Sequence, residues 1–300
     1  MTGVLWILTA ELLFAFMRLA TRVNAELLPW PLLSSTRFLG GALVVLGVAR
    51  LNGATLKVRD PRATWMRAIF GTGSSIGVFY ALGSSQISVG DATTLAATAP
   101  LWVAAFSKPL LGEPVSRRTM LGIALGFLGV VTLVGPSFGT AGPVALIALA
   151  GAASYAMAMV YLRKVGPRES SEAVAMHMSL VAGGTGLLLF LGGTAAPGDE
   201  GGVAWGDVHW WAVAVAALAG GLSQVAITRA YALDRAARLG AISYAGVLLT
   251  YALEAVALSR VPTPTQLAGA AFVVAAGLLT VTRGQRAPAE EASAAPSGDG

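Results

Sequence analysis

The stretch that decides the fold runs from Tyr80 to Val134 and reads "YALGSSQISVGDATTLAATAPLWVAAFSKPLLGEPVSRRTMLGIALGFLGVVTLV". A weaker second copy, "YALDRAARLGAISYAGVLLTYALEAVALSRVPTPTQLAGAAFVVAAGLLTV", occupies Tyr231–Val281. Both copies begin with Tyr-Ala-Leu, and Gly90 of the first matches Gly240 of the second. The repetition predicts two structural repeats built from the same set of elements.

The composition predicts an all-α polytopic membrane protein. Hydrophobic residues make up 55% of the 300 residues and charged residues only 12%, whereas soluble domains carry about 25% charged residues. Apolar runs of about 20 residues, the length that crosses the hydrocarbon core, recur along the chain. In such a chain the net charge of +5 reflects the loops, so no nucleic-acid partner is expected.

We predict ten membrane spans, separated by short breaks that contain Gly, Pro and charged residues. They lie near Gly3–Arg22, Pro31–Ala49, Met66–Ser85, Asp91–Leu111, Thr119–Gly135, Gly142–Tyr161, Glu172–Leu191, His209–Arg229, Leu239–Leu258 and Thr265–Val281. Spans one to five form a first repeat, residues 1–135, and spans six to ten form a second, residues 142–283. Residues 284–300 have the Ala/Pro/Glu/Ser bias of a disordered tail.

The basic residues predict the orientation of the chain. With a cytoplasmic N-terminus, 16 of the 20 Lys and Arg residues fall in cytoplasmic segments or at their edges. Arg67 is one of these 16 residues. Lys and Arg favour that side of membrane proteins, so both termini are predicted to be cytoplasmic. The four exceptions are Arg18, Arg22, Arg37 and Arg260.

Matching turns of the two repeats have exchanged their positive charge. The turn "GSSQISVGD" has no basic residue, whereas its counterpart "DRAARLG" has two. Conversely, "GEPVSRRT" has two arginines and its counterpart "RVPTPTQ" has one. Five spans per repeat, an odd number, would invert the second repeat relative to the first. Inverted repeats are typical of secondary transporters, whose substrate site lies near the midplane between the repeats.

Three stretches resemble the EamA family of the drug/metabolite transporter superfamily: "STRFLGGALVVL" (Ser35–Leu46), "DATTLAATAPLWVAAFSKPLLGEPVS" (Asp91–Ser116) and "GIALGFLGVVTLV" (Gly122–Val134). The second repeat departs from the family pattern, with "SRVPTP" (Ser259–Pro264) in place of Gly-Glu. The resemblance implies ten helices around a central cavity lined by spans one, three, four, six, eight and nine. It also implies export of amino acids or related metabolites.

Two acidic residues lie inside predicted spans. Glu11 lies about 12 Å from the start of the first span, where a carboxylate costs about 2.5–3.5 kcal/mol on insertion scales unless it faces a cavity or is neutralised. We predict that Glu11 carries a proton; the alternative is a water-filled vestibule around it. Glu254, with Tyr251 one turn before it, is expected to form a polar site or to reach the outer headgroups.

Arg18 lies two turns beyond Glu11 on the same helix face. Since the two residues are about 10 Å apart along the axis, no direct pair is predicted. Arg18, Arg22 and Arg37 are expected to extend to the outer headgroups, and a gate or a substrate-carboxylate site at Arg18 is the alternative. Glu113 is expected to pair with the arginines that follow it or to cap the fifth span.

Other polar or unusual residues at membrane depth complete the candidate substrate and proton pathway. Pro100 is expected to bend the fourth span by removing a backbone hydrogen bond, for a cavity or for packing alone. Trp102 beside it would line the cavity or face lipid. The remaining candidates are expected either to bind substrate or to join helices and anchor the interfaces; they are Ser75, Tyr80, Tyr155, Gln224 and Tyr231.

These features favour a secondary transporter that exports small organic metabolites across the inner membrane of a bacterium, with protons as a possible coupling ion. Drug or quaternary-cation efflux, metabolite uptake and a non-transporting assembly subunit are the alternatives. Without a Gly-x-x-x-x-Gly-Lys-Ser/Thr motif, ATP hydrolysis is not expected. The chain has no cysteine, and His177 and His209 are far apart in it, so neither an enzyme site, a metal nor a cofactor is predicted. Whether it is a monomer or a homodimer is left open.

Overall fold

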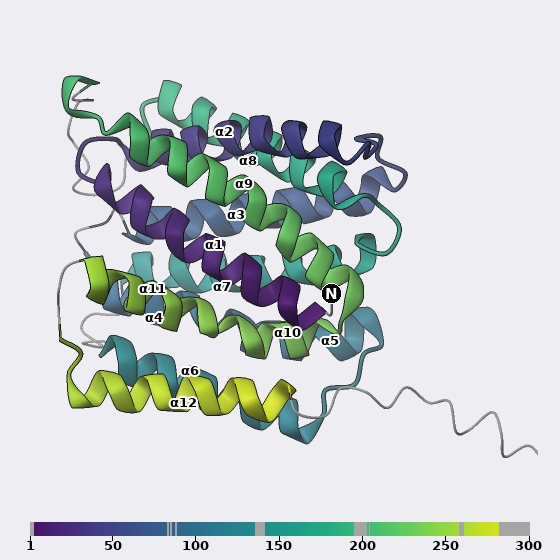
Figure 1. Ribbon diagram of the computed structural model, residues 1–300, viewed down its shortest axis with the longest axis vertical. Coiled ribbons are helices and arrows are strands. Elements are labelled where there is room, and N and C mark those ends of the chain that lie inside the picture. The colour runs from purple at the N-terminus through teal and green to yellow at the C-terminus, as the bar shows by residue number, and fades with distance from the viewer. Residues whose placement is uncertain are drawn as a thin grey trace, which may run out of the picture.

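The computed structural model describes residues 3–82, 84, 86–87, 89–135, 142–194, 203, 205–257 and 261–281, and within these residues the regular secondary structure consists only of helices (Figure 1). The predicted tail at 284–300 lies outside them. The elements are α1 (Gly3–Val23), α2 (Trp30–Leu51), α3 (Pro61–Leu82), α4 (Val89–Ala96), α5 (Ala99–Leu111), α6 (Arg117–Val134), α7 (Pro143–Val165), α8 (Ser171–Leu191), the 3-10 turn η1 (Trp205–Asp207), α9 (Trp210–Leu233), α10 (Ala236–Ser243), α11 (Ala245–Ala257) and α12 (Pro264–Val281).

Eight segments of the described chain are long and apolar enough to cross a membrane, which confirms a polytopic membrane protein. They are α1, α2, α6, α7, α8, α9, the combined α10–α11 and α12. The predicted third and fourth spans are outside this set. Helix α3 carries Arg62 and Arg67, and the fourth span is divided into α4 and α5. Ten crossings therefore remain a prediction.

Proline and serine residues define several helix starts. Ser116 and Ser170 cap α6 and α8, because their hydroxyl oxygens accept hydrogen bonds from backbone N–H groups three residues later. Pro100 is the second residue of α5. A proline there cannot donate to the carbonyl of Ala96 four residues earlier, and α4 ends at that alanine. The predicted bend is therefore a break in the helix.

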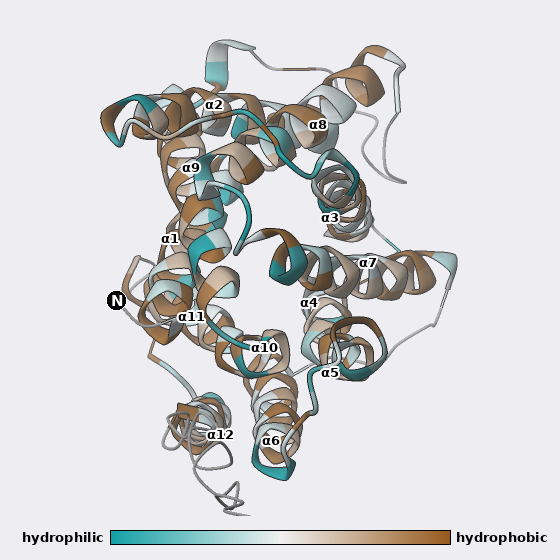
Figure 2. Ribbon diagram, turned by 90° about the vertical axis from the view of Figure 1, so that its right-hand side faces the viewer, coloured by the Kyte–Doolittle hydropathy of each residue, from teal (hydrophilic) through white to brown (hydrophobic). Residues whose placement is uncertain are grey.

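The helices form a bundle with two opposite edges (Figure 2). Helices α6 and α12 pack on one another at one edge, and α2 and α8 pack together at the other. Between them, α1 packs along α9 and α3 along α7, and α1 contacts α11 as α7 contacts α5. Large apolar side chains such as Leu43, Leu188 and Leu218 are exposed on outward faces. Such a surface suits hydrocarbon rather than water.

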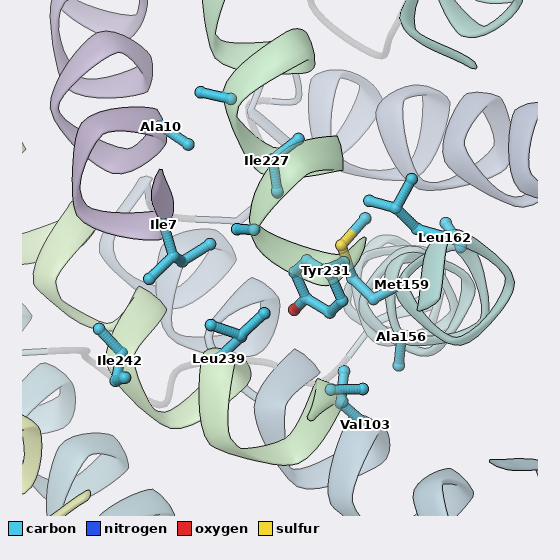
Figure 3. Packing of buried hydrophobic residues seen from close by; sticks show 14 of the residues in the cluster. Ile7, Ala10, Val103, Ala156, Met159, Leu162, Ile227, Tyr231, Leu239 and Ile242 are labelled. Carbon is cyan, nitrogen blue, oxygen red and sulfur yellow. The ribbon is translucent and has the colours of Figure 1, made fainter. Parts of the chain in front are cut away.

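The largest hydrophobic cluster joins α1, α5, α7, α8, α9 and α10. Figure 3 shows Tyr231 at its centre, with Ile7 on one side and Met159 and Leu162 on the other. Tyr231 is only 1% exposed. The expectation that Tyr231 anchors the membrane interface is therefore wrong, because α9 continues to Leu233 and packs along α1.

The first and last described residues lie at the same end of the bundle. Gly3 of α1 lies against Asp234, which follows α9, and Arg238 of α10 donates to the carbonyl oxygen of Thr280 at the end of α12. Arg163, near the end of α7, donates to the carbonyl oxygen of Tyr231, so this end of α7 is at the same place. The start of α7 instead packs with Ala92 of α4. The start of α4 at Asp91 and the turn after α9 at Asp234 thus lie at opposite ends of α7.

Helices α3 and α7 approach each other closely where Gly77 faces Gly151. A Cβ atom added to Gly77 would lie 2.9 Å from the Cα atom of Gly151 and 3.0 Å from the carbonyl oxygen of Ile147. Both neighbours are backbone atoms of α7, so they cannot rotate away. The contact therefore depends on the missing side chain.

We expect Gly77→Ala to destabilise the protein by about 1–3 kcal/mol, the usual cost of overpacking, despite the higher helix propensity of alanine. Thermal unfolding in detergent, followed by size-exclusion chromatography, measures the effect. Gly47→Ala in α2 is the matched control, because no atom lies within 4 Å of its added Cβ. Equal unfolding temperatures for the two variants would contradict the close approach.

Candidate functional site

Glu11 lies in the middle of α1 and is buried, with 3% of its surface exposed. Its carboxylate oxygen is 3.6 Å from Nη2 of Arg18. Arg18 also donates through Nη1 to the carbonyl oxygen of Gly246 at 3.3 Å and to the hydroxyl of Thr250 at 3.1 Å. A side chain at Gly246 would overlap the Glu11 carboxylate. This acid therefore packs directly on the backbone of α11.

The pairing of Glu11 with Arg18 corrects the expectation that they are too far apart. Both side chains are long, and an arginine two turns away can reach back along the same helix face. The two α11 acceptors, at Gly246 and Thr250, hold the Arg18 guanidinium at this depth. Arg18 is 42% exposed at its side chain, so only part of it remains free to reach solvent or headgroups.

One of the predicted polar residues contacts Arg67, and two more lie within electrostatic range of it. Its Nη2 group donates to Oε1 of Gln224 at 3.3 Å, and Tyr155 and Tyr231 lie within electrostatic range of its guanidinium. Both tyrosines also lie within electrostatic range of Glu11. Helices α1, α3, α7 and α9 thus place one buried acid, one buried base and three neutral polar groups in the same region of the bundle, and we call this set of residues the central cluster.

Arg67 was expected in a cytoplasmic segment, and the structure places it inside the bundle instead. Helix α3 begins at Pro61, five residues before the predicted start, which sets Arg67 about 9 Å along the helix. The surrounding "WMRAIFG" (Trp65–Gly71) is otherwise apolar. An arginine within an apolar run is the signal that could have identified it.

At the end of the bundle that holds Gly3 and Val281, an ion pair links α7 to the turn after α5. Nε of Arg163 lies 2.7 Å from Oε1 of Glu113, and the other carboxylate oxygen accepts from the backbone N–H of Ala236 at 3.1 Å. Glu113 was expected to pair with the arginines that follow it or to cap the fifth span. Glu113 pairs across the bundle because its turn packs against the start of α10 and the end of α7.

At the opposite end, a second ion pair links α1 to α11. Nη1 of Arg22 lies 2.8 Å from Oε1 of Glu254. Arg22 was expected to reach the headgroups; its side chain is 61% exposed and in addition pairs with the carboxylate of Glu254. Arg37 was expected to do the same but is buried, with its guanidinium 4.0 Å from the ring centroid of Phe38. Aromatic faces stabilise a cation in that position.

The other sequence-predicted residues do not join the central cluster. The Ser75 hydroxyl donates to the carbonyl oxygen of Gly71 within α3, Tyr80 packs edge-on against Trp30, and Trp102 packs against Phe106. Pro100 lies at the break before α5. Tyr251 lies in the middle of α11. Within the described residues, no group of three His, Asp or Glu side chains is placed to hold a metal ion.

One buried ion pair was not predicted from the sequence. Glu172 at the start of α8 is buried and accepts from Nη2 of Arg229 at 2.6 Å and from the side chain of Asn52 at 3.0 Å. Arg229 also lies over the ring of Trp6, 4.8 Å from its centroid. The three helices α2, α8 and α9 meet here, and only their packing brings these residues together.

The model of the EamA-like transporter family matches residues 1–135 and 142–282. The chain is similar to the pseudopaline exporter CntI of Pseudomonas aeruginosa, with 25% identity over 276 residues that cover 92% of this chain and 94% of the exporter. It is also 29% identical, over 184 residues, to the uncharacterized transporter YvbV of Bacillus subtilis, covering 56% of this chain and 59% of that protein.

A solved crystal structure of a protein superposes on this fold with a TM-score of 0.79 and 26% sequence identity, covering 93% of this chain and 97% of the other. The transporter-named relatives point to a transporter rather than an enzyme. Because the family model covers nearly the whole chain, the protein belongs to the EamA-like transporter family.

Proposed function

We propose that this protein is a secondary transporter that exports small organic metabolites, such as amino acids or related compounds, across the bacterial inner membrane by proton-coupled alternating access. The observation that carries the proposal is the central cluster. Charged side chains at membrane depth are costly and mark substrate or ion pathways. Here Glu11 and Arg67 are both buried among helices that join the two halves of the chain.

Alternating access is supported by contacts that match between the two predicted repeats. If α7–α12 repeats α1–α6, then α1 corresponds to α7, and the broken helix α4–α5 corresponds to α10–α11. The contact of α1 with α9 then matches that of α7 with α3, and the contact of α1 with α11 matches that of α7 with α5. The opposite placement of the Asp91 and Asp234 turns favours an inverted relation between the repeats.

The two end ion pairs obey the same correspondence. Arg22 is in the last turn of α1, as Arg163 is in the last turns of α7. Each pairs with a carboxylate near the end of the other repeat's broken helix, Glu254 or Glu113. We propose that each pair closes one side of the central cluster. Opening toward one side would then require breaking one pair while the other remains formed.

Export and proton coupling rest on separate observations. Export is favoured because the similar protein of Pseudomonas aeruginosa is named as an exporter. Coupling is favoured because Glu11 is a buried carboxylate paired with Arg18. Protonation would remove its charge and weaken this pair. Substrate binding near this pair would compete with that contact.

Purified protein in liposomes tests the proposal. We expect an outward-directed substrate flux driven by a pH gradient, and counterflow of a labelled solute against the same unlabelled solute. A screen of metabolites by thermal stabilisation selects the solutes for the assay. If no stabilising solute crosses the vesicle membrane faster than in protein-free liposomes, the transport function is wrong.

A further inference from the structure

Arg67 is a buried cation whose charge no carboxylate balances in the part of the chain that the structure describes. It is 3% exposed. Its Nη1 group donates to the sulfur of Met178 at 3.2 Å and its Nη2 group to Oε1 of Gln224 at 3.3 Å, while its buried Nε group has no hydrogen-bond partner. Burial of an ion among neutral groups is strongly unfavourable unless something compensates it.

The other arginines in the described residues are exposed, form ion pairs or lie over an aromatic ring. Six of them form ion pairs with Asp or Glu; these are Arg18, Arg22, Arg163, Arg168, Arg229 and Arg238. Arg37 is buried but lies over the ring of Phe38, with Phe79 5.8 Å from its guanidinium. Among the described residues Arg67 has neither a carboxylate partner nor an aromatic face, so we expect a bound anion to balance its charge.

The neighbours of Arg67 leave room for its guanidinium. A Cβ atom at Gly71, one turn later in α3, would overlap Nη1 of Arg67 and lie 2.6 Å from the sulfur of Met178. Tyr155 and Tyr231 lie within electrostatic range of the guanidinium. Their hydroxyls can donate or accept hydrogen bonds, so they add polar groups to the site without adding a charge.

We propose that Arg67 binds the carboxylate of the transported solute, so that the substrates of this protein are organic solutes with a free carboxylate. The inference rests on the proposed transport function. Guanidinium and carboxylate groups match in a planar pair with two parallel hydrogen bonds, and the unpartnered Nε group can donate one of them. One carboxylate group supplies the negative charge that balances the Arg67 guanidinium.

Thermal unfolding of the full-length protein in detergent tests the site with matched probes. L-phenylalanine and succinate are compared with phenylalaninamide and succinamide, and inorganic phosphate is the further anion. We expect at least one acid to stabilise the protein and its amide to have no effect. Arg67→Met should weaken binding of that acid by about tenfold or more, and Arg67→Lys should do so to a smaller extent, because lysine keeps the charge and loses the planar pair.

Arg62→Met is the control, since Arg62 is an exposed cation in the same helix; it should bind the acid as the unchanged protein does. Arg67→Met should unfold at a temperature no lower than the unchanged protein, because it removes an unbalanced buried charge. If Arg67→Met cannot be purified, Arg67→Lys decides, and unweakened binding in it overturns the inference.

Three other results would overturn the carboxylate site: Arg67→Met that binds the acid as tightly as before, an amide that stabilises as well as its acid, and a response to phosphate alone. Binding of none of the acids would do the same. In each case counterflow of basic and uncharged solutes still tests transport separately, so the proposed function can stand when the carboxylate site fails.

Discussion

Glu11→Gln is expected to reduce solute flux driven by a pH gradient to the level of protein-free liposomes, while counterflow without a gradient continues. Glutamine has nearly the shape of glutamate and can still accept a hydrogen bond from Arg18, but it cannot bind and release a proton. The Arg18 guanidinium keeps its contacts with Gly246 and Thr250, so the fold should persist.

Glu26→Gln is the matched control, since Glu26 is an exposed acid in the connection between α1 and α2. This variant should transport like the unchanged protein in both assays. Undiminished gradient-driven flux in Glu11→Gln would eliminate Glu11 as the proton carrier. Loss of counterflow together with gradient-driven flux would show that Glu11 serves binding or folding rather than coupling.

Linking the side chains of either end ion pair is expected to stop transport completely. The chain has no cysteine, so Arg22→Cys with Glu254→Cys, or Glu113→Cys with Arg163→Cys, supplies two unique thiols that a short, reducible bifunctional reagent can join. A link at one end holds that side closed, because the joined helices come from the two predicted repeats. Reduction should restore the flux.

The control for the linking experiment is a pair that does not join the repeats. Asp234 and Arg238 form an ion pair of 2.7 Å within one hairpin, and linking Asp234→Cys to Arg238→Cys should leave transport intact. Single-cysteine variants treated with the reagent control for modification alone. Normal flux through protein in which the two cysteines replacing one ion pair are linked would show that this pair does not open during transport.

Several features of the fold could be predicted from the sequence because they depend on neighbours in the chain. The apolar runs predict membrane helices, since a chain in hydrocarbon must satisfy its own backbone hydrogen bonds. Ser116 and Ser170 start helices through local capping, and Pro100 interrupts the fourth span by lacking an N–H group. Glu11 was identifiable as a buried acid because its depth follows from its position along one helix.

The partners of the charged side chains were decided by the tertiary structure alone. Glu113 could pair with an arginine a few residues away, but the packing of α7 brings Arg163 to 2.7 Å. Arg67 and Tyr231 lie near the ends of predicted spans, where side chains usually face the membrane interface. In the structure, helices from both halves of the chain bury them in the central cluster. A long side chain near a helix end can reach lipid headgroups, solvent or another helix at similar cost. Which of these it reaches depends on a neighbour distant in sequence, and that neighbour is set only when the helices pack.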